Sequence, residues 1–125
     1  AKKIPAPSLL MTILLTDDKT KFSSGHAELT EQAGQELDQL VANLKADNQP
    51  VFVEIQGHTD NTGSDAGNQQ LGLKRAEAVR LYLARAGLPL ARMATISYGE
   101  SAPLVDNNTR EGRSTNRRVQ LIVMR

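Results

Sequence analysis

The sequence predicts a two-layer α/β sandwich in the order β-α-β-α-β-loop-β, with a small mixed sheet and the helices packed on one face. Two long segments have apolar residues at helical spacing, and shorter apolar or alternating segments precede, separate and follow them. The chain has 125 residues, of which 39% are hydrophobic, and this suits one domain with one packed core. We expect a tail and first strand over residues 1–20 and the main domain over 21–125.

The first half of the predicted order begins with a short strand. Pro5 and Pro7 exclude a helix interior and a central strand from the first eight residues, and the apolar segment 10–15 then forms the strand. Thr30 is the expected N-cap of the first helix, which ends before Pro50. The apolar stripe of this helix consists of Ala33, Leu37, Leu40, Val41 and Leu44.

The second half continues with strand, helix and strand. Residues 51–57 alternate apolar and polar side chains, as a half-buried strand does, and a polar loop over 58–65 follows. The second helix covers 66–86, because its small and apolar side chains share one face and Gly87 then ends it. The remaining predicted segments are a third strand at 94–98, a polar, turn-rich loop at 99–115 and a last strand at 119–123.

The charge distribution favours an anionic partner for the second half of the chain. The net charge is +1, but residues 1–73 carry five lysines and ten acidic residues, whereas residues 74–125 carry nine arginines, one lysine and four acidic residues. Arginine suits planar recognition of carboxylate or phosphate. Nucleic acid is not the expected partner, because only four aromatic residues and no zinc-finger signature accompany the arginines.

Composition excludes two further classes of protein. The chain has no cysteine, so disulfides, thiolate metal sites and cysteine nucleophiles are excluded. No run approaches the roughly 20 apolar residues that span a bilayer, so we expect no membrane span within this chain.

The second helix and the loop before it contain a candidate binding site. Asn68 and Arg75 are seven residues apart, so at about 100° per residue both project along nearly the same line. Asn68 lies in the first turn, where free N–H groups favour an anion that Arg75 also reaches. Asp60, in the preceding loop, supplies a carboxylate for an ammonium group. The three residues suit a zwitterionic amino-acid group; alternatively, Asp60 and Arg75 form a structural ion pair with each other.

Three ordered motifs resemble those of a known family. They are Gly57-His-Thr-Asp-Asn-Thr-Gly63, then Asn68-x-x-Leu71-x-x-x-Arg75-Ala76-x-x-Val79-x-x-x-Leu83, and finally Gly112-Arg-x-x-Asn116-Arg-Arg-Val119. Over about residues 20–125 the chain therefore resembles the OmpA-like peptidoglycan-binding domain. That family includes the C-terminal domains of outer-membrane porin-like proteins, the peptidoglycan-associated lipoproteins and the flagellar stator B subunits.

This resemblance implies a periplasmic, non-catalytic domain of a Gram-negative bacterium that uses no metal or cofactor. It implies non-covalent binding of peptidoglycan through the diaminopimelate of the stem peptide, which anchors a larger envelope protein to the cell wall. Asp60 and Arg75 stand at the positions that hold the free end of diaminopimelate. The resemblance also implies supporting contacts from Thr62, Asn68 and Arg117, with Arg113 and Asn116 shaping the last loop.

The sequence departs from the family pattern at two places. The family commonly has serine at the position of Gly72, and glycine costs a helix about 0.5–1 kcal/mol relative to alanine. We therefore expect a close approach of this helix to the sheet. The family also often has Asp or Asn where residues 23–25 are Ser-Ser-Gly, so a side-chain contact from that segment is expected to be weak or absent.

Other functions fit the sequence less well. His26 and His58 lack the spaced partners of a zinc site, and residues 60–71 have Asp65 and Leu71 where a calcium loop needs Gly and Glu. No nucleophile, acid and base set for a hydrolase can be assembled. The main alternative is a protein-interaction or dimerisation module of the same fold, such as a homodimer, that does not bind peptidoglycan.

Overall fold

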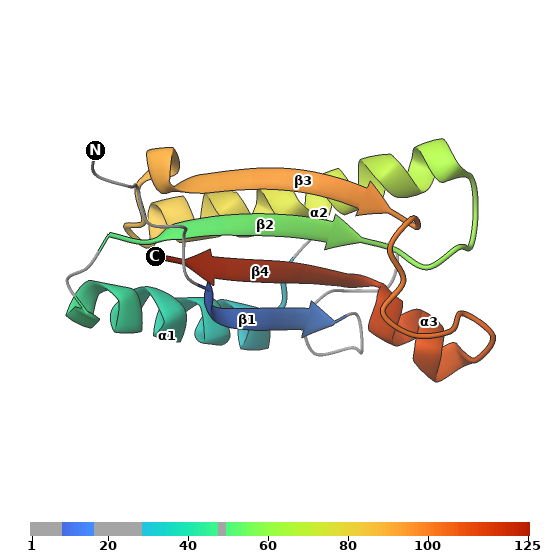
Figure 1. Cartoon of the computed structure of the whole chain (residues 1–125), viewed down its shortest axis with the longest axis horizontal. Helices are drawn as coiled ribbons and strands as arrows, with labels where there is room; N and C mark the ends of the chain where they lie inside the picture. The colour runs from blue at the N-terminus through green and yellow to red at the C-terminus, as the bar shows by residue number, and fades with distance from the viewer. Residues whose placement is uncertain (1–8, 17–28, 48–49) are drawn as a thin grey trace, which may run out of the picture.

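The computed structural model describes residues 9–16, 29–47 and 50–125. These residues form one four-stranded sheet with two long helices on one face, which confirms the predicted two-layer α/β architecture (Figure 1). The strands are β1 (Leu9–Thr16), β2 (Phe52–His58), β3 (Met93–Gly99) and β4 (Arg118–Met124). The helices are α1 (Glu31–Asp47), α2 (Asp65–Arg85), a short 3-10 helix η1 (Leu90–Arg92) and α3 (Arg110–Asn116).

The sheet is mixed, with the strand order β1-β4-β2-β3. β2 and β3 are parallel and are connected through α2, whereas β4 lies antiparallel to both of its neighbours, β1 and β2. The carboxyl ends of β2 and β3 therefore lie at the same end of the sheet as the beginning of β4. This end is on the right in Figure 1, where α2 begins and α3 lies.

Local sequence chemistry sets the helix boundaries. The Thr30 hydroxyl accepts a hydrogen bond from the N–H of Ala33 at 3.2 Å, which confirms it as the N-cap of α1. The Ser64 hydroxyl accepts from the N–H of Gly67 at 3.0 Å and caps α2. After α2 ends, Gly87 has a φ of +113°, a left-handed conformation that favours glycine.

The sequence prediction missed α3, which begins inside the expected polar loop over 99–115. Its N-cap is Thr109, whose hydroxyl accepts from the N–H of Gly112 at 2.9 Å. The helix has seven residues and buries only Gly112 and Asn116, so it has no apolar stripe for periodicity to detect.

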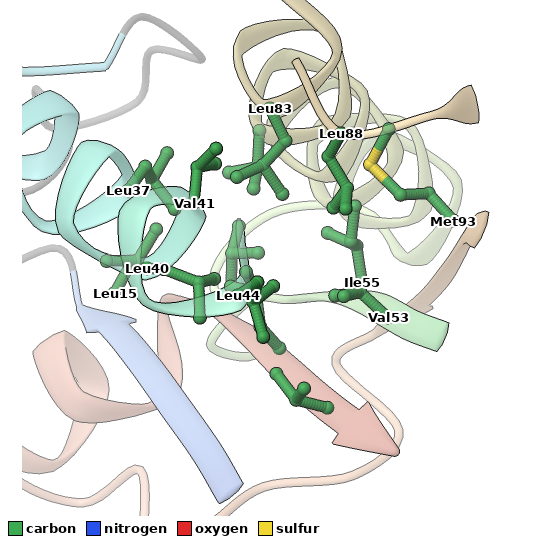
Figure 2. Packing of buried hydrophobic residues seen from close by; sticks show 14 of the residues in the cluster. Leu15, Leu37, Leu40, Val41, Leu44, Val53, Ile55, Leu83, Leu88 and Met93 are labelled. Atoms are coloured by element: carbon green, nitrogen blue, oxygen red, sulfur yellow. The ribbon is translucent and has the colours of Figure 1, made fainter. Parts of the chain in front are cut away.

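The core lies between the sheet and the two long helices. The labelled side chains of α1 point toward α2, which contributes Leu83, and toward the buried face of the sheet, which contributes Ile55 (Figure 2). The predicted apolar stripe of α1 is buried in full. The sheet contributes alternate residues to this core: Leu15 from β1, Val53 and Ile55 from β2, and Val119, Leu121 and Val123 from β4.

Helix α2 crosses β2 at a contact between two glycines. A Cβ atom built on Gly57 would lie 1.8 Å from the carbonyl oxygen of Gly72, and one built on Gly72 would lie 2.5 Å from the hydroxyl oxygen of Ser97. The close approach expected from Gly72 is therefore confirmed, and its partner on the sheet is Gly57. This contact fixes the depth at which the first turn of α2 sits beside the end of β2.

Candidate functional site

The predicted site residues other than Arg75 lie in the loops and helix ends where β2 and β3 terminate. The loop over 59–64 connects β2 to α2, the loop over 100–109 connects β3 to α3, and α3 leads directly into β4. Figure 1 shows all three connections at the same end of the molecule. Ligand sites of open α/β sheets commonly lie at this edge.

Asp60 is the buried carboxylate of this loop cluster. It is 4% exposed, one of its oxygens accepts the N–H of Thr62 at 2.8 Å, and the other is 2.5 Å from the guanidinium of Arg117. Burial by itself raises the pKa of Asp60, but the hydrogen bonds from Thr62 and Arg117 outweigh it and lower the pKa overall. The carboxylate is therefore charged at neutral pH, and the ion partner that the structure gives it is Arg117 rather than Arg75.

Asn68 connects the first turn of α2 to both neighbouring loops. It is 7% exposed, and its amide nitrogen lies 3.3 Å from the carbonyl oxygen of Asp60 and 3.0 Å from that of Thr62. The same nitrogen is 3.3 Å from a carboxylate oxygen of Glu100. Sequence reasoning missed Glu100, although it lies in the polar segment that follows the predicted strand 94–98, just as the loop of Asp60 follows the strand before it.

Arg75 is fully buried, which is rare for an arginine. It belongs to the same buried face of α2 as Asn68 and Gly72, as the helical spacing predicts. A guanidinium at this depth is held in a low-dielectric environment, where its interaction with an anion is stronger than at the surface.

Arg113 and Asn116 both contact the loop between β3 and α3. The side-chain oxygen of Asn116 accepts from the N–H groups of Leu104 and Val105 at 2.8 and 3.0 Å, and its amide nitrogen donates to the carbonyl of Val105 at 2.8 Å. Arg113 donates to the carbonyl of Asn107 at 3.0 Å. The buried Asn116 thus fixes the shape of this loop beside the Arg117–Asp60 ion pair.

His58, the last residue of β2, lies buried next to the site and was not among the predicted site residues. Gln56 donates through its amide nitrogen to Glu54 at 3.2 Å, so its oxygen faces the Nε2 of His58 at 3.1 Å. The proton of the neutral imidazole is therefore assigned to Nε2. Burial and the nearby charge of Arg118 lower the pKa of His58 to about 4.

This pKa predicts how the stability of the domain depends on pH. The unfolded chain protonates His58 near its ordinary pKa of 6.5, whereas the folded chain does so only near 4. The unfolded state therefore binds more protons within this window. We expect the free energy of unfolding to be constant above about pH 6.5 and to fall by about 1–3 kcal/mol as the pH decreases to 4.

Urea denaturation across pH 4–8 tests this expectation, with His58→Gln as the control. The variant should show a flatter profile between pH 4 and 6.5, although His26, the other histidine of the sequence, remains in both proteins. Asp60 does not contribute to the slope between pH 4 and 6.5. Because its pKa is lowered in the folded state, its contribution to stability is lost only below about pH 4. Equal slopes in the two proteins would contradict the assignment to His58.

The part of the chain that the structure describes contains neither a candidate metal site nor a candidate membrane-spanning helix. No group of three or more His, Cys, Asp or Glu residues within them is placed to hold a metal ion. None of the helices in this part of the chain is long and apolar enough to cross a membrane.

A groove of about 420 Å³ lies at the opposite end of the sheet, where β2 and β3 begin. Most of the residues that line it are apolar, Lys45 and Arg92 are its two cations, and it shares no residue with the predicted site. The candidate site is therefore not part of this groove.

The fold and the site define a two-layer α/β domain with a buried carboxylate near the carboxyl edge of its sheet and a buried arginine on the helix that follows. The sequence profile of the OmpA family matches residues 21–117, which is most of the chain. The chain therefore belongs to the OmpA family.

Individual relatives agree with this assignment. The chain is 42% identical over 83 residues to outer membrane porin F of Pseudomonas fluorescens, which covers 66% of this chain and 26% of the porin. It is 36% identical over 109 residues to the peptidoglycan-binding protein ArfA of Mycobacterium bovis, which covers 87% of this chain and 33% of ArfA. The chain thus spans about a quarter to a third of the length of these curated relatives.

A solved structure is similar over most of both chains. The crystal structure of the peptidoglycan-associated lipoprotein from Burkholderia pseudomallei superimposes with a TM-score of 0.76 at 33% identity. The match covers 83% of this chain and 87% of that one. The two-layer fold, including its mixed sheet, is therefore that of a known OmpA-like domain.

Proposed function

We propose that this domain binds peptidoglycan without catalysis, by holding the free zwitterionic end of diaminopimelate in the stem peptide. The observation that carries the proposal is the buried, charged Asp60 beside the N-terminus of α2, whose buried face also contains Arg75. Two matched relatives are described as peptidoglycan-associated or peptidoglycan-binding, which supports association with the same polymer. In this role the domain anchors a larger envelope protein in the periplasm.

The two charged groups suit the two charges of the ligand. The Asp60 carboxylate receives the ammonium group, and Arg117 remains beside it as a second partner. Arg75 and the positive end of α2 receive the carboxylate, because a guanidinium binds a carboxylate through two parallel hydrogen bonds. Thr62 and Asn68 hold the loop that carries Asp60, so they position this carboxylate.

Calorimetric titration with three small ligands tests the recognition of a zwitterion. Meso-diaminopimelate has an ammonium and a carboxylate at each end, pimelate lacks the ammonium groups, and 1,5-diaminopentane lacks the carboxylates. We expect saturable one-site binding of meso-diaminopimelate and an affinity at least about tenfold lower for both analogues, because each loses a charge-assisted contact.

The variant Arg75→Lys separates planar recognition from charge alone. Lysine keeps the positive charge but cannot form two parallel hydrogen bonds with a carboxylate, so we expect weaker binding of meso-diaminopimelate in a folded variant. If neither free diaminopimelate nor intact sacculi bind the wild-type domain, the alternative of a protein-interaction module, including a homodimer, replaces this proposal.

A further inference from the structure

Three side chains lie next to one another in a row on the sheet face that points away from the helices, at the same end as the candidate site, with His58 between the other two. They come from three adjacent strands: His58 from β2, Tyr98 from β3 and Arg118 from β4. His58 and Arg118 are direct partners in the antiparallel register of β2 and β4. The rings of His58 and Tyr98 are stacked, with centroids 5.1 Å apart and planes 10° from parallel.

Arg118 also holds the loop that covers this end of the sheet. Its guanidinium donates to the carbonyl oxygens of Asn116 and Ala102, each at 3.2 Å. A third nitrogen of the side chain donates to Gln120 at 3.2 Å. Arg118 and His58 are each 3% exposed, so these contacts are shielded from water.

Each member of this cluster lies within two residues of a group at the candidate site. His58 precedes Asp60 by two residues, Tyr98 precedes Glu100 by two, and Arg118 directly follows Arg117. The N–H of Thr59 donates to the carbonyl of Gly99 at 2.9 Å, so the β2 and β3 ends are also joined at the backbone. A change in the spacing of these three strand ends therefore moves the site residues relative to one another.

We propose that His58, Tyr98 and Arg118 are positioning residues, which set the separation of the three strand ends that carry Asp60, Glu100 and Arg117. The expected effect of these residues on ligand affinity rests on the proposed function. Their expected effect on the structural stability of the loops does not. The low pKa of His58 agrees with this role, because a neutral imidazole stacks beside Arg118 without repulsion.

The test compares truncations at two positions on the same strand. Tyr98→Ala removes the stacked ring, and Tyr98→Phe restores it without the hydroxyl. Ile96→Ala is the matched control, because Ile96 is two residues earlier on the same face and is 40% exposed. Tyr98 is only partly buried, so its truncation is less disruptive than loss of the buried Arg118.

The first measurement is native-state amide hydrogen exchange, which needs no ligand. The informative amides are those of Thr62, which donates to Asp60, and of Leu104 and Val105, which donate to Asn116. We expect these amides to exchange at least about tenfold faster in Tyr98→Ala than in Ile96→Ala, with wild-type rates in Tyr98→Phe. Equal exchange in the two alanine variants would overturn the proposal.

The second measurement is the affinity for meso-diaminopimelate at pH 7.5, at a temperature where all variants are folded. We expect about a tenfold loss in Tyr98→Ala and less than about a twofold change in Tyr98→Phe and Ile96→Ala. A wild-type protein that binds, together with an unchanged affinity in Tyr98→Ala, would contradict the positioning role alone. A wild-type protein that does not bind would contradict the proposed function, and hydrogen exchange would still decide the positioning role.

Discussion

Replacing Asp60 by asparagine should weaken binding of meso-diaminopimelate by at least about 30-fold, because it removes the charge that pairs with the ligand ammonium. Asparagine keeps the size of the side chain and an oxygen that accepts the N–H of Thr62, so the loop retains its local turn. The Arg117 side chain, which loses the ion pair with Asp60, is 23% exposed, and solvent compensates part of this loss. Calorimetric titration at pH 7 measures the affinity, and thermal denaturation verifies the fold.

Asp65→Asn is the matched control for this variant. Asp65 is the exposed first residue of α2, so the substitution removes the same charge from the same end of the molecule without touching the buried carboxylate. We expect its affinity to remain within about threefold of wild type, since exposed charges are screened. Equal losses in the two variants would indicate only a long-range electrostatic effect, and would contradict direct contact between Asp60 and the ligand.

The sequence predicted the helices and strands that form because of a local pattern of apolar residues. The apolar stripe of α1 and the alternation in β2 and β4 have the periods of a helix and of strands, and both appear in the structure. Helix α3 has no such stripe, because its turns are held by the Thr109 cap and by Asn116 rather than by apolar packing. Its polar sequence was therefore indistinguishable from that of a loop.

In the site, too, contacts between residues close in sequence could be predicted, whereas contacts between residues far apart in sequence could not. Asn68 is eight residues from Asp60, and the helix that carries it begins within this interval, so spacing was enough to bring them together. The ion pair of Asp60 and Arg117 joins residues 57 positions apart, and it depends on β4 lying between β1 and β2. No spacing rule gives this pairing, which is why the sequence suggested an ion pair of Asp60 only with Arg75, as the alternative to a ligand site.

Replacing Gly57 by alanine should lower the free energy of unfolding by at least about 3 kcal/mol, which is the second large effect expected. The added Cβ would lie 1.8 Å from the carbonyl oxygen and 2.4 Å from the carbonyl carbon of Gly72. Both are backbone atoms of a long helix, so no side-chain rotation relieves the overlap. Helix α2 would have to move away from β2, which would open the core around Ala76 and Val79. Urea denaturation of the wild type and of the variant measures the difference.

Gly63→Ala separates this steric effect from the conformational cost of losing a glycine. Gly63 has a φ of +88°, and a Cβ built on it meets no atom within 4 Å. We therefore expect alanine there to cost only about 1–2 kcal/mol, the penalty of a left-handed backbone. Gly72→Ala should be intermediate, because its Cβ meets the flexible Ser97 hydroxyl at 2.5 Å, and Ser97→Ala should relieve part of the cost. If Gly57→Ala destabilised the domain no more than Gly63→Ala, the backbone contact between α2 and β2 would not constrain the fold in solution.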